Sequence, residues 1–223
     1  MPACPIASTP LNSSAMAEEL QDPMSRLVDA KLTLPEASFV TGLSVKAIDR
    51  EIDAHIVKPR AEPDPDHRRL RSIAGPDAVY LLLVRDLHNE LSPRLRRQVC
   101  KAVWDAIEED RAYARLAWLM LPVREAGQEV LGKIETLERA KHELVESRPE
   151  VMGGEPVVKG TRIPARMVAE LVRQGASKDE LRDDFDLTPE QVDAAVLFDR
   201  VTPKRGRPRT RREGVTEHVP ADR

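Results

Sequence analysis

Basic side chains gather in one stretch of the sequence, and their types suggest a chemistry. Lys46 and Arg50 follow Ser44 on a short predicted helix. The others flank a segment rich in Pro and Asp: Arg60, His67, Arg68, Arg69 and Arg71. Such cations bind backbone phosphates of nucleic acid and supply much of the affinity, but little sequence information. The alternative interpretation is an ordinary helical domain whose arginines form a solvated face. We favour the first, because the cluster coincides with a predicted hairpin.

Two short helices are predicted to position these residues. Leu34–Val40 is the first, with Pro35 in its first turn. Gly42 interrupts the pattern, and Ser44 then caps a second helix. On that helix Val45, Ile48 and Ile52 recur at offsets of three and four, so we expect them to face inward. Its N-terminal side chains, Ser44, Lys46 and Arg50, are then free to reach base edges in a major groove.

A hairpin and two more helices are expected next. Ile56–Arg60 and Arg69–Ile73 read as strands around the loop Ala61–His67. Helical patterns follow from Pro76 to Leu87, and from Ser92 to about Glu109. This order, with its Arg-Arg-Leu-Arg run, resembles the winged helix-turn-helix of the MerR and excisionase type. The loop departs from the usual Gly and Tyr form of that family. The resemblance implies DNA contacts from seven residues: Ser44, Lys46, Arg50, Arg60, Arg68, Arg69 and Arg71.

The middle of the chain is less definite. Tyr113–Leu121 fits a strand or a helix equally well. Val123–Leu144 is predicted to be one helix, with an apolar stripe on an otherwise charged surface; the stripe comprises Val130, Ile134, Leu137 and Leu144. That stripe either packs against its own domain or contacts a second copy of the chain.

A second compact unit is predicted from residue 147. Pro156–Lys159 and Thr161–Ile163 are expected to pair across Gly160 as a small hairpin. A helix should run from Pro164 to Gln174, and capping boxes beginning at Ser177 and Thr188 predict two more. Five residues are assigned to turns. Gly153, Gly154 and Gly160 suit positive φ or crowded backbone, and Thr161 and Arg162 are expected to brace the hairpin.

The run from Arg148 to Pro164, with its two glycine turns, is similar to the small DUF-433 domain. Gln174–Ser177 and Asp186–Val192 fit the same pattern. Proteins with this domain resemble VapB-type antitoxins, which are encoded beside a PIN-like ribonuclease toxin. The resemblance therefore implies a cognate ribonuclease as partner. It does not say which surface would meet that partner.

The C-terminal residues are strongly basic. Seven cations and no acid occur from residue 200 to residue 212: Arg200, Lys204, Arg205, Arg207, Arg209, Arg211 and Arg212. Three uses remain open. Lys204, Arg205, Arg207 and Arg209 could enter the acidic pocket of a toxin. Arg205–Pro208 has the core of an AT-hook, which places arginine in a narrow minor groove. The tail could also have no fixed partner.

Composition narrows the class of protein. The 223 residues include 35 Lys and Arg and 38 Asp and Glu, for a net charge of -3, and only 3% are aromatic. Charged, aromatic-poor chains favour helices with modest cores. The five histidines lack metal-ligand spacing, and nucleotide-binding or nucleophile motifs are absent, so we expect no enzyme and no cofactor. Two cysteines and the lack of a long apolar run favour a cytoplasmic protein without membrane spans.

The expected fold is mainly α, in five parts. A disordered leader (1–31) precedes a MerR-like winged helix-turn-helix (32–110), a connecting strand or helix (111–146), a three-helix DUF-433-like domain with a small hairpin (147–202), and a flexible basic tail (203–223). The leading hypothesis is a type II antitoxin that neutralises a PIN-like ribonuclease and represses its own operon as a homodimer. The alternative is a stand-alone MerR-like regulator with a C-terminal protein-interaction domain.

Overall fold

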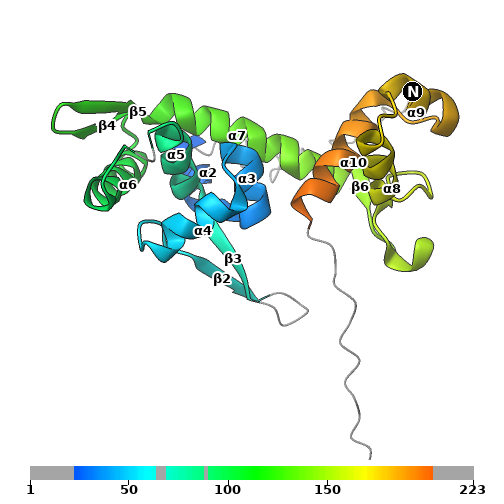
Figure 1. The fold of residues 1–223 in the computed structure, drawn as a ribbon, viewed down its shortest axis with the longest axis horizontal. Helices are drawn as coiled ribbons and strands as arrows, with labels where there is room; N and C mark the ends of the chain where they lie inside the picture. The colour runs from blue at the N-terminus through cyan, green and yellow to red at the C-terminus, as the bar shows by residue number, and fades with distance from the viewer. Residues whose placement is uncertain (1–22, 64–68, 88–89, 203–223) are drawn as a thin grey trace, which may run out of the picture.

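The computed structural model describes residues 23–63, 69–87 and 90–202. The chain is mainly helical, as the sequence predicts, and its described residues form three small antiparallel sheets. Figure 1 shows two lobes joined by one long helix, α7 (Val123–Arg139). We call residues 23–139 the N-lobe and residues 145–202 the C-lobe. The short π-helix η1 (Ala140–Leu144) continues α7 into the C-lobe.

The N-lobe contains two short helices followed by an antiparallel hairpin, in the order that the sequence predicts, and we call the hairpin, residues 60–74, the wing. Its elements up to α7 are α2 (Pro23–Asp29), β1 (Lys31–Thr33), α3 (Leu34–Thr41), α4 (Val45–Asp53), β2 (Arg60–Pro63), β3 (Arg69–Ala74), α5 (Gly75–Val84), α6 (Pro93–Glu108), β4 (Tyr113–Leu116) and β5 (Leu119–Pro122). The first sheet has the order β1-β3-β2, so β1 adds a third strand to the wing hairpin. Because β1 ends directly before α3, this third strand connects the hairpin to the N-terminus of α3.

The folded chain begins earlier than the sequence predicts. The expected leader runs to residue 31, but α2 and the start of β1 lie within that range, and Met24 and Leu27 are buried. A Cβ atom added to Gly75 would lie 2.2 Å from the backbone oxygen of Leu27. Helix α5 therefore begins directly against the end of α2. Because this packing joins distant parts of the chain, local composition does not reveal it. Residues 1–22 of the predicted leader lie outside the described residues.

The first wing strand also differs from its prediction. Ile56 and Val57 were expected to lie in a strand, but both are buried in the loop that follows α4, and β2 begins only at Arg60. The two side chains belong to the hydrophobic core under α4. An apolar pair in a loop and an apolar pair in a strand look alike in sequence, which explains the error.

The segment Tyr113–Leu121, which the sequence left open between strand and helix, lies within two strands and the turn between them. β4 and β5 pair across a two-residue turn, and Ala117 in that turn has φ of 52°. The apolar stripe on α7 packs within its own chain: Val130, Ile134 and Leu137 are buried in the N-lobe core. The surface that the sequence offered as a dimer contact is thus largely covered already.

The C-lobe has three helices, as predicted, over a small sheet. Its elements are β6 (Val145–Glu146), the 3-10 helix η2 (Met152–Gly154), β7 (Val157–Val158), α8 (Ala165–Arg173), α9 (Lys178–Phe185) and α10 (Pro189–Val201). The predicted hairpin is only partly present. β7 pairs with β6, and Thr161–Ile163 form no strand, although Val158 N–H donates to the oxygen of Ile163 at 2.9 Å. The partner strand lies upstream and carries no local signal.

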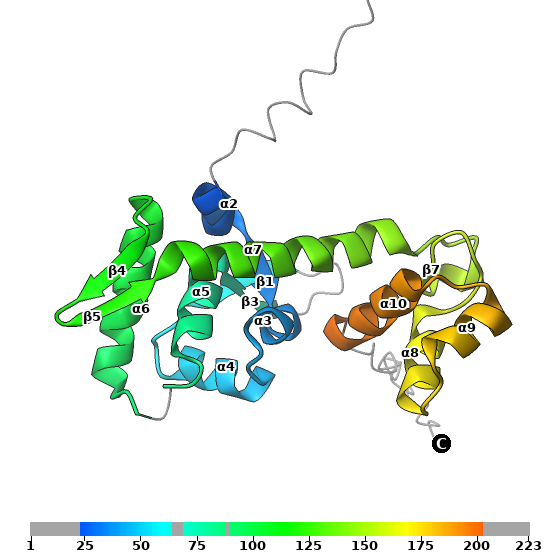
Figure 2. The ribbon, with the colours of Figure 1, turned by 90° about the horizontal axis from the view of Figure 1, so that it is seen from above.

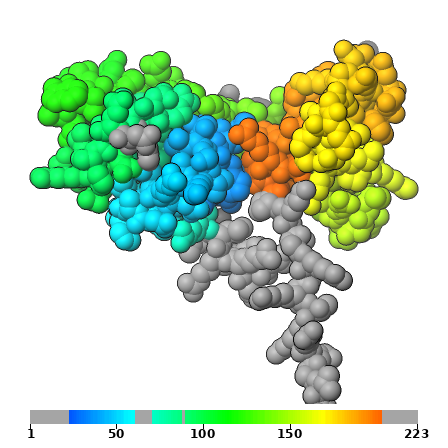
Figure 3. All heavy atoms as spheres, in the orientation of Figure 1, coloured from blue at the N-terminus to red at the C-terminus, as the bar shows by residue number. Residues whose placement is uncertain are grey.

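The two lobes touch along the end of α10. Val201 is buried in the N-lobe core, and the Arg200 guanidinium lies 5.8 Å from the ring centroid of Phe39 on α3. Figure 3 shows the orange end of α10 against the blue surface of the N-lobe. Figure 2, seen from above, shows α7 running along both lobes. The lobes are therefore packed against each other as well as being connected by a helix.

Candidate nucleic-acid interface

The turn between α3 and α4 is held by local hydrogen bonds. Gly42 has φ of 75°, in the left-handed region that glycine tolerates best, and its N–H donates to the oxygen of Ser38. The Ser38 hydroxyl donates to the oxygen of Leu43 at 2.6 Å. Ser44 Oγ accepts from the N–H of Ala47 at 3.2 Å, so it caps α4 as predicted. The hydroxyl that was a candidate for base contact is thereby oriented toward the helix end.

The inner face of α4 is fixed by apolar packing and one buried carboxylate. Ile48 and Ile52 are buried as expected. Glu51 is fully buried between them and accepts a hydrogen bond from Tyr80 Oη at 3.0 Å. It also forms an ion pair with Arg96 of α6. Burial, followed by the charge of Glu51, raises the pKa of the Tyr80 phenol. This network joins α4 to α5 and α6 and fixes its orientation.

Val45 does not share that face. It is 38% exposed and lines a groove at the start of α4, contrary to the inward orientation predicted from spacing. The offset pattern includes position 45, but this residue begins α4 and lies at the groove. The core therefore covers Ile48 and Ile52 and leaves Val45 partly uncovered.

The outer face of α4 carries charges of both signs. Lys46 and Arg50 are exposed, as the sequence predicts. Asp49 follows Lys46 by three positions and Asp53 follows Asp49 by four, so both acids share this face. Arg71 of β3 contacts both carboxylates, at 3.3 Å and 3.4 Å. Arg71 thus offsets part of the negative charge of the two acids. Sequence reasoning missed these two aspartates, although their spacing relative to Lys46 marks the exposed face.

The wing projects below α4 in Figure 1. Arg60 is half-buried at the start of β2, where its backbone oxygen accepts a hydrogen bond from Ser72 Oγ at 3.0 Å. Arg69 lies on β3 opposite Pro63. Arg68 and His67 lie outside the described residues. Lys46, Arg50 and Arg71 therefore lie on or against the outer face of α4, whereas Arg60, which is opposite Ser72, lies on the other face of the hairpin from Arg71.

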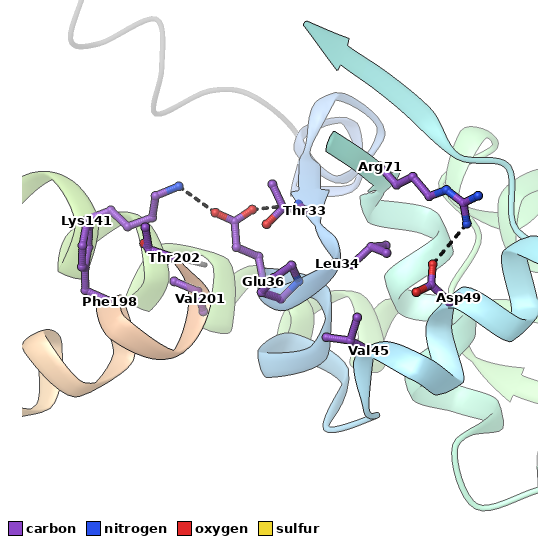
Figure 4. Close-up of a pocket in the computed structure, with 11 residues that line it drawn as sticks. Thr33, Leu34, Glu36, Val45, Asp49, Arg71, Lys141, Phe198, Val201 and Thr202 are labelled. Carbon is purple, nitrogen blue, oxygen red and sulfur yellow. Dashed lines mark hydrogen bonds and ion pairs between the residues drawn. The ribbon is translucent and has the colours of Figure 1, made fainter. Parts of the chain in front are cut away.

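A groove of about 660 Å³ separates the helix-turn-helix from the C-lobe. Glu36 of α3 faces Lys141 of η1 across the groove (Figure 4). The Lys141 Nζ lies 2.7 Å from Glu36 Oε1, and the backbone N–H of Thr33 donates to Glu36 Oε2. Val201 and Phe198 of α10 form its C-lobe wall. The polar groups in the groove are mainly paired with one another. Within the described ranges, no group of three or more His, Cys, Asp or Glu could hold a metal ion.

The predicted turn residues of the C-lobe lie in two tight turns. Gly153, Gly154 and Gly160 have φ of 65°, 85° and 80°. A Cβ atom at Gly153 or Gly160 would meet nothing within 4 Å, so backbone conformation is the reason for glycine there, and crowding is not. Thr161 Oγ1 donates to the oxygen of Val158 at 2.8 Å and accepts from the N–H of Ile163 at 3.0 Å. The Arg162 side chain is exposed, away from these bonds.

Two further predictions concern the ends of the chain and the membrane. The four tail cations assigned to toxin binding, Lys204, Arg205, Arg207 and Arg209, lie outside the described residues. No helix in the described ranges has both the length and the apolar composition needed to cross a membrane.

Comparison with known proteins gives three similarities. Residues 145–198 match the family described as "Protein of unknown function (DUF433)", which corresponds to the C-lobe. The chain is 29% identical over 189 residues to the uncharacterized protein y4eO of Sinorhizobium fredii, covering 80% of this chain and 84% of that protein. The crystal structure of Rv2018 from Mycobacterium tuberculosis is similar at 16% identity. It covers 74% of this chain and 95% of that one, with a TM-score of 0.31.

Proposed function

We propose that this protein is a DNA-binding regulator that reads its target with α4 and clamps the adjacent backbone with the wing. The observation that carries the proposal is the two-sided character of α4. Its inner face is locked by Ile48, Ile52 and the buried Glu51, while Lys46 and Arg50 extend from its outer face beside the wing. A rigid helix with outward cations next to a hairpin is the geometry that docks in a major groove.

The mixed charge of α4 shapes how that docking would work. Asp49 and Asp53 repel phosphates, and Arg71 from the wing contacts both but offsets only one of their two charges. Together with Lys46 and Arg50, these groups leave a single net positive charge on the outer face of α4. Nonspecific affinity should be modest, and discrimination between sequences should depend on the bases that Lys46 and Arg50 meet.

Binding to the DNA upstream of the protein's own gene tests this proposal. We expect fluorescence anisotropy to show specific binding that weakens as salt rises. Arg50→Ala should lose about 1–3 kcal/mol of discrimination against random DNA. Arg162→Ala, which removes an exposed cation from the C-lobe, is the matched control and should bind as the wild type does. Equal loss on specific and random DNA would make Arg50 a phosphate contact, and no binding at low salt would refute the proposal.

A second candidate function is that of an antitoxin, whose C-lobe and basic tail bind a ribonuclease toxin. The C-lobe has its own hydrophobic cluster, so one chain could hold DNA at the N-lobe and a protein at the C-lobe. The match of residues 145–198 to DUF433 directs attention to this lobe, and the toxin itself rests on the VapB resemblance.

Co-expression with the neighbouring gene tests the antitoxin. We expect a small acidic PIN-like protein to co-purify and its toxicity to be suppressed. A chain ending at residue 202 separates the tail from the C-lobe, because loss of suppression would assign the contact to the tail cations. If no neighbouring product binds, the stand-alone regulator is the better description.

A further inference from the structure

The β4–β5 hairpin presents an apolar outer face that the rest of the fold leaves open. Alternation along the strands divides its side chains. Ala114 and Leu121 are buried against the N-lobe core. Tyr113 and Met120 lie on the opposite face and are 50% and 53% exposed, and Trp118 at the tip is 88% exposed. Burying one face of a two-stranded hairpin keeps it folded, but it does not explain three large apolar side chains in water.

We propose that this outer face is the homodimer contact, where a second copy of the chain packs its own hairpin against it. The evidence for this contact is the exposed apolar side chains of the hairpin. The importance of a dimer rests on the proposed DNA-binding function, because a two-fold protein matches a palindromic site. The α7 stripe, the other surface considered for this role, is buried within its own chain.

The exposed apolar area supplies about two thirds of what a specific dimer interface needs. A large aromatic side chain offers about 150–250 Å², so the three side chains together leave roughly 400 Å² of apolar surface on each copy. Two copies supply about 800 Å², and a specific interface needs about 1,200 Å² or more in total. Arg115, Pro122 and the hairpin backbone surround the patch and can provide the remainder. The patch thus supplies the apolar centre of an interface and its surroundings the rim.

The charges near the hairpin favour a copy of the same chain over a polyanion. Arg115 is the one charged residue between Tyr113 and Pro122, and it shares the outer face with Tyr113 and Met120. The acids at the hairpin base, Glu109 and Asp110, are paired with arginines. Arg115 is therefore a single surplus cation, which is too little positive charge to attract nucleic acid or an anionic lipid surface. A guanidinium stacks well on Trp or Tyr rings, so Arg115 of each copy finds aromatic partners on the other.

The position of the hairpin is compatible with this arrangement. Figures 1 and 2 both place β4 and β5 at the end of the molecule farthest from the C-lobe. Pairing there leaves the C-lobes at opposite ends of the dimer and leaves the wing uncovered. A partner for the C-lobe and a DNA duplex could then bind without competing for the hairpin.

Sedimentation velocity of the full chain tests the proposal. We expect the wild type to change from about twice its monomer mass of 25.0 kDa to the monomer mass on dilution. Trp118→Ser combined with Met120→Ser should weaken the dimer by about 30-fold or more, as removal of a central aromatic side chain does. Met167→Ser on α8 is the matched control, because Met167 is 42% exposed on the C-lobe, and it should leave the dimer intact. A wild type that stays monomeric at about 100 μM, or an equally stable dimer in the double variant, would overturn the proposal.

Tryptophan quenching gives a readout that does not depend on variants. The chain has two tryptophans, and Trp104 is half-buried with its Nε1 donating to Asp77 at 2.8 Å. Acrylamide should therefore quench Trp118 readily in dilute solution and poorly in concentrated solution. A dimer in which Trp118 stays fully quenchable contradicts the assignment. Because neither measurement contains DNA, a protein that dimerises through the hairpin but never binds DNA would refute only the regulator.

Discussion

At the scale of single residues, Glu51 is a buried carboxylate that links α4 to the two helices packed against it. Its neighbours on the outer face are exposed charges, yet Glu51 itself has no exposed surface. A buried carboxylate is costly unless charged and polar partners surround it, and here Arg96 and Tyr80 provide them. The same network lies between α4, α5 and α6. We infer that the orientation of the proposed reading helix depends on it.

Removing parts of this network should destabilise the chain unequally. Tyr80→Phe removes one hydrogen bond to a charged group and should lower the free energy of unfolding by about 1.5–3 kcal/mol. Glu51→Ala should lower it by about 3–5 kcal/mol, because Arg96 is then left buried without its carboxylate. Urea unfolding monitored by circular dichroism measures both. Equal losses in the two variants would show that Tyr80, rather than the ion pair, carries the network.

Cys100 should make stability fall at alkaline pH. Burial, helped by the nearby charge of Asp77, raises the pKa of this thiol from 9.0 to about 12. Between these values the unfolded chain loses a proton that the folded chain keeps, so the free energy of unfolding decreases as pH rises. From pH 8 to pH 10 the wild type should lose about 1.4 kcal/mol more than Cys100→Ala. Urea unfolding in reducing buffer at each pH gives the two slopes. Parallel slopes would mean that the thiol ionises alike in both states.

At the scale of elements, α2 and α5 approach each other closely enough for their backbones to be in contact. Gly75 begins α5 where a Cβ atom would collide with the Leu27 backbone. Backbone cannot move aside as a flexible side chain can, so the two helices must separate to admit any larger residue. Met24 and Leu27, which the sequence assigned to a disordered leader, are therefore part of the core.

Two glycine variants test this contact. Gly75→Ala should destabilise the chain by about 1–3 kcal/mol through overpacking and should increase amide exchange in α2. Gly132→Ala is the control, because Gly132 lies inside α7 and a Cβ atom there would meet nothing within 4 Å. That variant should gain about 0.5–1 kcal/mol from helix propensity. A Gly75→Ala chain as stable as the wild type would show that α2 is not held against α5.

The elements also show how far sequence reasoning extends. The caps at Ser44, Ser177 and Thr188 were predictable, because capping depends on residues three positions apart. The β6–β7 pairing was not, since each strand is only two residues long and carries too little pattern to mark it as a strand. The β4–β5 turn contains Ala117 and Trp118 in place of the usual Gly or Asn, so the hairpin remained ambiguous.

In the candidate site, too, local patterns could be predicted and contacts between elements could not. The outward orientation of Lys46 and Arg50 could be derived from helical spacing. The pairing of Arg71 with Asp49 could not, because it joins strand β3 to helix α4. The burial of Glu51 was equally inaccessible, since its partners come from α5 and α6. Contacts between elements, rather than the elements themselves, limited the prediction.

At the scale of the whole molecule, the two lobes share part of one core. Val201 ends the last helix of the C-lobe but is buried in the N-lobe cluster, next to half-buried Leu197. One exposed ion pair, Arg139 with Glu190, joins the lobes as well, and Lys141 of η1 pairs with Glu36, which is buried. Exposed ion pairs add little stability, so we expect the buried apolar contact to dominate the coupling. Binding at the C-lobe can then influence α3, and through it α4.

Substitutions at two buried valines in α10 should reveal this coupling. Val201→Ala should lower the free energy of unfolding by about 1–2 kcal/mol and shift the transition seen by Trp104 and Trp118, which both lie in the N-lobe. Val192→Ala is the control, because Val192 is equally buried but belongs to the C-lobe cluster. If the lobes can separate, circular dichroism should record the loss in Val192→Ala while tryptophan fluorescence changes less. An unchanged fluorescence midpoint in Val201→Ala would contradict a shared core, and signals between the lobes would then have to pass through α7 alone.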